Sequence, residues 1–354
     1  MAEPRLDPAL LAAIRAGGEA LDRGLRGPAP ELDLLRAAGL LVAPLPVACG
    51  GSGWDGAEAA TVLCDALVAL GGASLPIARI FEGHVNAVKL VMRHGSAVQR
   101  TAVAERVLGG ALLGVWGADG ATPVVIEGAG DAAVLVGSKL FSSGLGDVAL
   151  GIVLARSEAG LQMVLVAADD PARADHDAWD VAAMVGSRSG RFDCTGLPAG
   201  PAQCVGGPDA VLAEPEFHGG LWRLAACYAG AMEQLARATA ALIDRRGQRE
   251  SAVMQLRLGN IALEAHGALL WTRAAAAAVE GGGAAAVQTA LFAREAVEQG
   301  ALRLLAVVER IAGSTLHRRD SELGRSDRDL RFYLRQADLD GKLALATSLW
   351  SARI

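Results

Sequence analysis

The chain has 354 residues, of which 52% are hydrophobic and 20% are charged, and this balance excludes a disordered or fibrous protein. The formal net charge is -6 and aromatic residues make up 4%. A basic surface for nucleic acid or anionic lipid is therefore not expected, and neither is a row of stacking platforms for single strands. A chain of this length is expected to form two or three domains.

The five cysteines are scattered and never stand at CxxC spacing. Their odd number and spacing favour a reducing cytosol over a disulfide framework and argue against a cysteine-built zinc site. The six histidines show no metal-ligand spacing. The N-terminal residues lack an apolar signal segment, and no uncharged apolar run is long enough for a membrane helix. We expect a cytoplasmic protein without a metal and without nucleic-acid or membrane partners.

The first part of the chain, from Ala9 to about Gly110, has apolar residues at helical spacing. Its clearest predicted helices span 57–70 and 75–94. Each is followed by glycine, at Gly71 and Gly95 respectively, and glycine is typical of the end of a helix.

The middle of the chain has a different pattern. Short apolar runs alternate with Gly, Asp and Pro clusters at intervals of roughly ten residues, which predicts the strands of a sandwich or barrel. No helix-length segment separates the runs, so a parallel doubly wound sheet is not expected. The predicted strands span 112–116, 123–126, 133–136, 149–155 and 161–166.

The helical period returns after Phe217 and predicts four long helices with short connections, typical of an antiparallel bundle. They span 220–245, 251–280, 284–313 and 328–352, and glycines 281–283 separate the second from the third. The predicted fold is therefore multidomain α+β. It has an N-terminal helical domain (1–110), a middle antiparallel β-barrel or sandwich (111–213) and a C-terminal four-helix bundle (214–354).

Motifs read from residue types alone are few. Residues 51–56 match GxGxxG, but prolines interrupt the preceding segment and no acid follows at the required distance, so a tight loop is expected there. Asp338 and Asp340 are either a general base or solvated acids at a helix break. Arg245 and Arg246 either bind a phosphate or complement the end of a helix.

Five stretches, in order and spacing, resemble the acyl-CoA dehydrogenase family. They are LRAAGLLVAPLPVACGGSGWDG (35–56), IARIFEGHVNAVKLVMRHGSAVQR (77–100), KLFSSGLGDVALGIVLAR (139–156), VGSRSGRFDCTG (185–196) and CYAGAMEQLARATAALIDRR (227–246). The resemblance implies a helical domain, a β-barrel and a four-helix bundle, in a homo-oligomer that is a dimer or tetramer.

The resemblance also implies flavin chemistry. FAD would lie between the barrel and the bundle, with its pyrophosphate reaching a neighbouring subunit. A carboxylate would remove the α-proton of an acyl-CoA or acyl-carrier-protein thioester while flavin N5 takes the β-hydride. This is a step of fatty acid metabolism, and an electron-transfer flavoprotein would reoxidise the flavin.

Site residues follow from the same resemblance, position by position. Phe141 would pack on the flavin, and the Ser143 hydroxyl would lie near N5 and O4. The remaining implied cofactor contacts are backbone groups of Val115, Trp116 and Gly117 and the side chain of Arg245 or Arg246. Glu82 would lie at the floor of the acyl cavity, and His84 matches a histidine of the family's monooxygenase branch.

The catalytic base departs from the family pattern. Counting along the last helix puts Ala337 at the base position and Asp338 directly after it, whereas an insertion of three residues would align Asp340 with the family's glutamate. The family's alternative base position falls near Gly220.

Three functions remain open at this point. The first is an FAD-dependent acyl-CoA dehydrogenase that uses Asp338 or Asp340. The second is a two-component flavin monooxygenase. The segment RDLRFYLRQAD (328–338) resembles the last helix of that branch, and His84 supports it, although Gln336 replaces the branch's second histidine. The third is a non-catalytic paralogue, favoured by the base positions and by the altered phosphate segment GADGATP (117–123).

Overall fold

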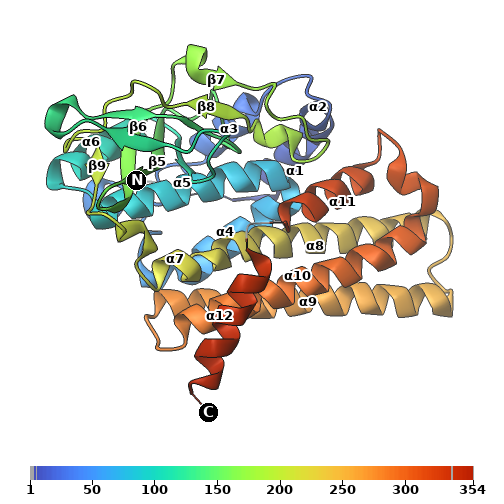
Figure 1. Ribbon diagram of the computed structural model, residues 1–354. Coiled ribbons are helices and arrows are strands. Elements are labelled where there is room, and N and C mark those ends of the chain that lie inside the picture. Colours follow the sequence, from blue (N-terminus) through green and yellow to red (C-terminus); the bar gives the residue numbers. More distant parts are fainter. Residues whose placement is uncertain (1–3, 5, 336–337, 354) are drawn as a thin grey trace.

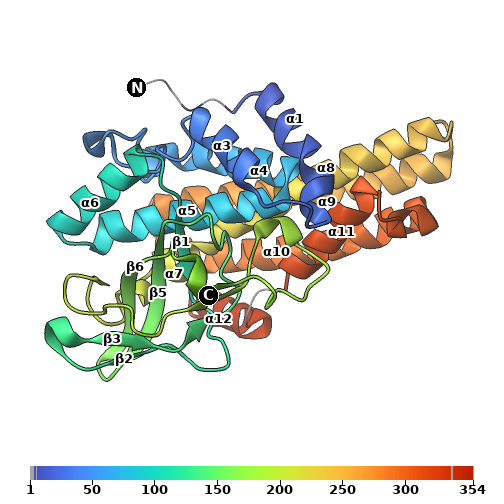
Figure 2. The same cartoon turned by 90° about the horizontal axis from the view of Figure 1, so that it is seen from above.

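The computed structural model describes residues 4, 6–335 and 338–353. Strands of the middle segment lie on one side of helix α5, and the long C-terminal helices lie on its other side (Figures 1 and 2). The helices before the first strand are α1 (Pro8–Ala16), α2 (Gly18–Asp22), α3 (Ala29–Ala37), α4 (Ala60–Ala73), α5 (Leu75–His94) and α6 (Ala97–Leu108).

The prediction for the N-terminal helices is confirmed in its main features. Helix α5 has the predicted ends, because Pro76 suits its first turn and Gly95 follows its last residue. Helix α4 begins three residues later than expected, since 57–59 form a 3₁₀ turn, and it continues through Gly71 to Ala73, so the predicted end at Gly71 was wrong. Residues 51–56 form the expected loop and not the start of a helix.

The strands form two sheets. One has the order β3-β2-β5-β6-β9 with β1 also paired to β5, and the other has the order β4-β8-β7. The strands are β1 (Leu113–Trp116), β2 (Val125–Glu127), β3 (Val134–Val136), β4 (Ser138–Lys139), β5 (Leu150–Ser157), β6 (Gly160–Ala167), β7 (Ala174–Asp175), β8 (Arg191–Asp193) and β9 (Cys204–Val205).

The larger sheet is mixed, which corrects the expectation of purely antiparallel pairing. Both β1 and β2 run parallel to β5, whereas β5 and β6 pair antiparallel over their whole length. Apolar alternation indicates where a strand lies but not the direction of its neighbour, so the sequence could not reveal this. The strands missed from sequence are two or three residues long, too short to show a period.

The C-terminal helices are α7 (Glu216–Gly219), α8 (Leu221–Arg245), α9 (Ala252–Glu280), α10 (Ala286–Ala312), α11 (Glu322–Tyr333) and α12 (Leu339–Ser351). The first three long helices match the prediction to within two residues at each end. The expected fourth helix over 328–352 was wrong as a single element, because α11 and α12 are separate helices that pack against α8 and α10 respectively. Helix α4 also packs against α8 and α9.

Two glycines allow α4 and α8 to cross in backbone contact. A Cβ at Gly230 would lie 1.9 Å from the carbonyl oxygen of Val68, and one at Gly71 would lie 2.2 Å from that of Cys227. Only glycine fits such an approach. The crossing fixes the first turns of α8 beside α5, where the polar residues described next lie.

Candidate functional site

A cavity of about 510 Å³ lies between the strands, α5 and the beginning of α8. Its lining is divided into an apolar part and a polar part. The apolar part includes Leu90, Met92, Val115, Leu154, Val211, Phe217, Leu221 and Leu224. The polar part includes Asp55, Arg79, Glu82, Asn86, Lys89, Arg93, Glu216 and Arg223. A cavity of this size and mixed lining is typical of a small-molecule site.

Most of the polar lining comes from one stripe of α5. Arg79, Glu82, Asn86, Lys89 and Arg93 follow each other at intervals of three or four residues, which places them on one face of the helix. Only Glu82 of this stripe was predicted as a site residue, although the spacing of all five is visible in the sequence.

A chain of hydrogen bonds joins this stripe to α8. Arg79 Nη1 donates to Glu82 Oε2 at 2.5 Å, and Asn86 donates to the other oxygen of Glu82. The guanidinium of Arg223 donates from Nε to Asn86 Oδ1 at 2.5 Å. Glu82 is thus held by two donors at the polar end of the cavity.

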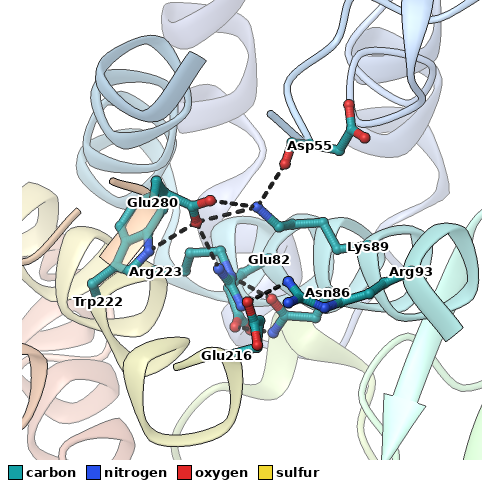
Figure 3. A network of polar contacts seen from close by, with 9 residues as sticks. All are labelled: Asp55, Glu82, Asn86, Lys89, Arg93, Glu216, Trp222, Arg223 and Glu280. Carbon is teal, nitrogen blue, oxygen red and sulfur yellow. Dashed lines mark hydrogen bonds and ion pairs between the residues drawn. The ribbon is translucent and has the colours of Figure 1, made fainter. Parts of the chain in front are cut away.

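A second centre is the carboxylate of Glu280, at the end of α9 (Figure 3). It accepts hydrogen bonds from Lys89 Nζ at 3.0 and 3.1 Å, from Trp222 Nε1 at 3.3 Å and from Arg223 Nη1 at 3.4 Å. Burial lowers the pKa values of the Lys89 ammonium and the Arg223 guanidinium from their ordinary values. Glu280 therefore stabilises two buried cations at once.

The remaining polar lining includes Arg93, Glu216 and Asp55. Arg93 pairs with Glu216, whose Oε2 atom is buried without a partner among the described residues. Asp55 accepts a hydrogen bond from Lys89 through its backbone carbonyl, and its carboxylate points away from Lys89 (Figure 3). Burial raises the pKa of this carboxyl above its ordinary value.

His84 is part of the same helix but lies outside this cavity lining. The Leu113 amide donates to its Nδ1 at 3.0 Å, so the proton of the neutral ring is on Nε2, which donates to the Leu41 carbonyl at 2.7 Å. Burial lowers the pKa of His84 to about 4. Both ring nitrogens have backbone partners, and the predicted substrate-binding role of His84 stays a prediction.

The predicted flavin contacts in segment 141–143 form a distinct surface beside β1. Phe141 is 49% exposed, has a left-handed backbone and contacts Trp179 edge to face, and Trp179 contacts Phe332 in the same way. The Ser143 carbonyl accepts a hydrogen bond from Trp116 Nε1 at 3.2 Å.

This surface fits a flavin ring in its chemistry. Ser189 Oγ donates to Ser143 Oγ at 3.1 Å, so the Ser143 proton remains available to an acceptor. The neighbouring Ser142 Oγ is buried and has no partner among the described residues. An exposed aromatic ring beside a free hydroxyl donor suits a planar heterocycle with ring acceptors.

The other predicted flavin contacts, Val115 and Trp116 of β1 and Gly117 after it, differ in their surroundings. Val115 borders the cavity, whereas Trp116 is buried against Phe192 with ring centroids 4.8 Å apart. The Gly117 carbonyl accepts a hydrogen bond from Lys139 Nζ at 3.0 Å. Their predicted contact with a flavin stays a prediction.

Arg245 and Arg246 lie at the far end of α8, about 33 Å along the helix from Arg223. Arg246 donates to the carbonyls of Ile311 and Ala312 at 2.6 and 3.2 Å and so caps the end of α10. The predicted contact with a neighbouring subunit's cofactor cannot form within one chain and stays a prediction.

The predicted catalytic acids are on α12 or at its start. Asp338 has a left-handed backbone before the first turn, and both Asp338 and Asp340 are exposed. Neither borders the cavity. Ala337 and Gln336 lie outside the described residues. Gly220, near the alternative base position, borders the cavity and is followed one turn later by Arg223.

Two further observations concern the described ranges as a whole. Within residues 4, 6–335 and 338–353, no group of three His, Cys, Asp or Glu side chains is arranged to hold a metal ion. In the same ranges no helix combines the length and the apolar character needed to cross a membrane. All five cysteines are free thiols.

No family model matches the sequence, and no curated protein matches it. Solved structures do match. TdsC from Paenibacillus sp. A11-2, in complex with FMN and indole, is 18% identical over 98% of this chain and 96% of its own, with a TM-score of 0.83. KijD3 in complex with dTDP is 19% identical over 99% of both chains, with a TM-score of 0.83.

Butyryl-CoA dehydrogenase from Megasphaera elsdenii is 14% identical over 97% of this chain and 98% of its own, with a TM-score of 0.78. Identities this low establish the fold and not the reaction. The resemblance seen in the sequence is confirmed at that level: this chain has the acyl-CoA dehydrogenase fold.

Proposed function

We propose that the protein is a flavin-dependent oxidoreductase. The observation that carries the proposal is the surface at 141–143, where an exposed aromatic ring and an available hydroxyl lie beside β1. The fold supports it, since TdsC has this fold and is described in complex with FMN. A bound flavin supplies the redox chemistry, either by taking a hydride from the substrate or, once reduced, by reacting with oxygen.

The roles of this chain's residues follow from their surroundings. Phe141 packs on the flavin ring, held in place by Trp179, and Ser143 donates its free proton to a ring acceptor. The substrate binds in the adjoining cavity between α5 and α8. The flavin is FAD by the sequence resemblance or FMN by the likeness to TdsC, and extraction with mass measurement distinguishes them.

Of the two reactions, we favour oxygen-dependent monooxygenation over α,β-dehydrogenation. Dehydrogenation of an acyl-CoA or carrier-protein thioester needs a carboxylate aimed at the α-carbon. Asp338 and Asp340 are exposed and away from the cavity lining, and Glu82 is held by Arg79 and Asn86. Monooxygenation does not require that base.

Dehydrogenation remains the second candidate. The likeness to butyryl-CoA dehydrogenase covers nearly the whole chain, and Asp338 follows directly on the segment where the family's base is expected. That reaction would pass its electrons to an electron-transfer flavoprotein. The third reading, a non-catalytic paralogue, is tested by the first step below.

Flavin binding is measured first, by fluorescence quenching of FMN and of FAD. We expect Phe141→Ala to weaken it about tenfold, because an aromatic contact is lost. Trp350→Ala, which removes an exposed ring on α12, should leave it unchanged. Failure of both flavins to bind the wild-type protein would contradict the proposal and favour the non-catalytic reading.

The two candidate reactions are then distinguished under anaerobic conditions. Bleaching of the flavin by an acyl thioester, lost in Asp338→Asn or Asp340→Asn with flavin retained, would establish dehydrogenation. We expect no bleaching. We expect instead that substrate is consumed only with oxygen and a separate reductase.

A further inference from the structure

The polar end of the cavity carries more hydrogen-bond donors than its own acceptors use. A guanidinium has five N–H groups. Arg79 donates through Nη1 alone, and Arg223 donates through Nε and Nη1. Within the described part of the chain, neither Nη2 group donates a hydrogen bond. Both side chains border the cavity, and neither Nη2 atom is among the buried polar atoms without a partner, so solvent reaches both groups.

The acceptors at the same place are already engaged. Glu82 accepts from Arg79 and Asn86 on its two oxygens, and Asn86 Oδ1 accepts from Arg223. The oxygens of Glu280 accept from Lys89, Trp222 and Arg223. At the two arginines the unmet hydrogen-bonding capacity is therefore on the donor side, and a ligand that binds them has to bring acceptors. Elsewhere in the lining, beside Arg93, Glu216 Oε2 is a buried acceptor without a partner among the described residues.

The charges of the lining balance, because Arg79, Lys89, Arg93 and Arg223 stand with the carboxylates Asp55, Glu82, Glu216 and Glu280. The cations are nevertheless concentrated where α5 meets α8, whereas the Asp55 carboxylate points away from Lys89 and Glu216 pairs with Arg93 (Figure 3). A ligand at this end of the cavity therefore meets guanidinium donors first.

The guanidinium of Arg223 lies over the turn at the start of α8, where a Cβ at Gly220 would meet the Glu216 carbonyl oxygen at 2.5 Å and Arg223 Nη2 at 2.7 Å. Glycine at this position therefore allows Nη2 to lie close to the backbone. Two arginines with unused donors thus border one cavity, and guanidinium groups bind carboxylate and phosphate through paired N–H donors.

We propose that Arg79 and Arg223 bind an oxyanion group of the substrate, a carboxylate or a phosphate. The substrate is therefore an anionic small molecule and not an unsubstituted acyl chain, which would separate these donors from water without replacing their hydrogen bonds. This inference deepens the proposed function, because the bound group belongs to the molecule that the flavin would oxidise.

The test uses the full chain and three probes: malonate, inorganic phosphate and the neutral malonamide, at constant ionic strength. We expect malonate or phosphate to raise the melting temperature of the wild-type protein and malonamide to leave it unchanged. The stronger of the two anions identifies which oxyanion the site prefers. No effect of either anion would overturn the proposal.

The matched variants are Arg79→Gln and Arg223→Gln, with Arg237→Gln on the exposed face of α8 as the control. Titration calorimetry should show anion affinity falling about tenfold or more in the first two, since hydrogen bonds to a charged group are lost, and unchanged in the control. Arg79 keeps the test valid if Arg223→Gln fails to fold, because Arg79 makes one ion pair. Equal affinity in all three variants would overturn the proposal.

Measuring flavin binding alongside anion binding tests this inference and the proposed function independently. Arginine-dependent anion binding in a protein that takes up no flavin would leave the oxyanion site standing and contradict the flavin function. If the two variants weaken binding of FMN but not of riboflavin, the arginines serve the flavin's phosphate, and the substrate-binding proposal is overturned.

Discussion

Helix α5 presents two sets of buried polar groups, and they differ in what satisfies them. On the side facing β1, His84 uses both ring nitrogens for backbone partners. On the side facing the cavity, Arg79 and Glu82 belong to a network that extends to Arg223. In this network the Nη2 groups of both arginines have no acceptor among the described residues. A buried polar group with a full set of protein partners supports the fold. Unused donors beside a cavity indicate a ligand.

The largest effect is expected at Glu280, because this one carboxylate accepts hydrogen bonds from Lys89, Trp222 and Arg223. Replacing Glu280 with Gln removes the charge that two buried cations share and should lower the free energy of unfolding by about 3–5 kcal/mol. Urea denaturation at neutral pH measures this change.

The matched control is Glu264→Gln on the same helix. Glu264 pairs with Arg303, whose side chain is 59% exposed, and the loss should be about 1 kcal/mol or less. Equal losses in the two variants would show that the network around Glu280 is no more stabilising than an ion pair at the surface.

The His84 side of α5 should respond to pH. The pKa of His84 is about 4 in the folded protein and 6.5 as its ordinary value, so between these values the unfolded chain binds the proton more readily. The free energy of unfolding is therefore unaffected by this histidine above about pH 6.5 and falls as the pH decreases toward 4. The total decrease is about 3 kcal/mol.

Comparison with His84→Gln isolates this contribution. Asp329 titrates in an overlapping range with the opposite sign, because burial raises its pKa to about 7, and its effect cancels in the difference between the two proteins. A difference in unfolding free energy that does not change with pH would contradict the buried, neutral state of His84.

Much of the fold could be predicted from the sequence, because long amphipathic helices such as α5 and α9 show their period over many turns. The candidate site was harder to predict. The five-residue polar stripe of α5 was visible as spacing, but nothing in the sequence shows that Arg223 and Glu280, more than 130 residues away, complete it. Pairings over such distances depend on the glycine crossing of α4 and α8.

The smallest effect on stability is expected for Arg79→Gln. This variant also tests most directly whether the cavity side of α5 binds a ligand. Arg79 borders the cavity and makes one ion pair, with the buried Glu82, and Gln in its place can still donate a hydrogen bond to that carboxylate. We expect the free energy of unfolding to fall by about 1–3 kcal/mol, less than in Glu280→Gln, because Glu82 keeps its hydrogen bond from Asn86. Urea denaturation with and without malonate measures both properties of this residue. Stabilisation by malonate should disappear in Arg79→Gln, whereas the protein without ligand should remain more stable than Glu280→Gln. A loss as large as that of Glu280→Gln would instead make Arg79 a structural residue, and the two sides of α5 would then differ only in degree.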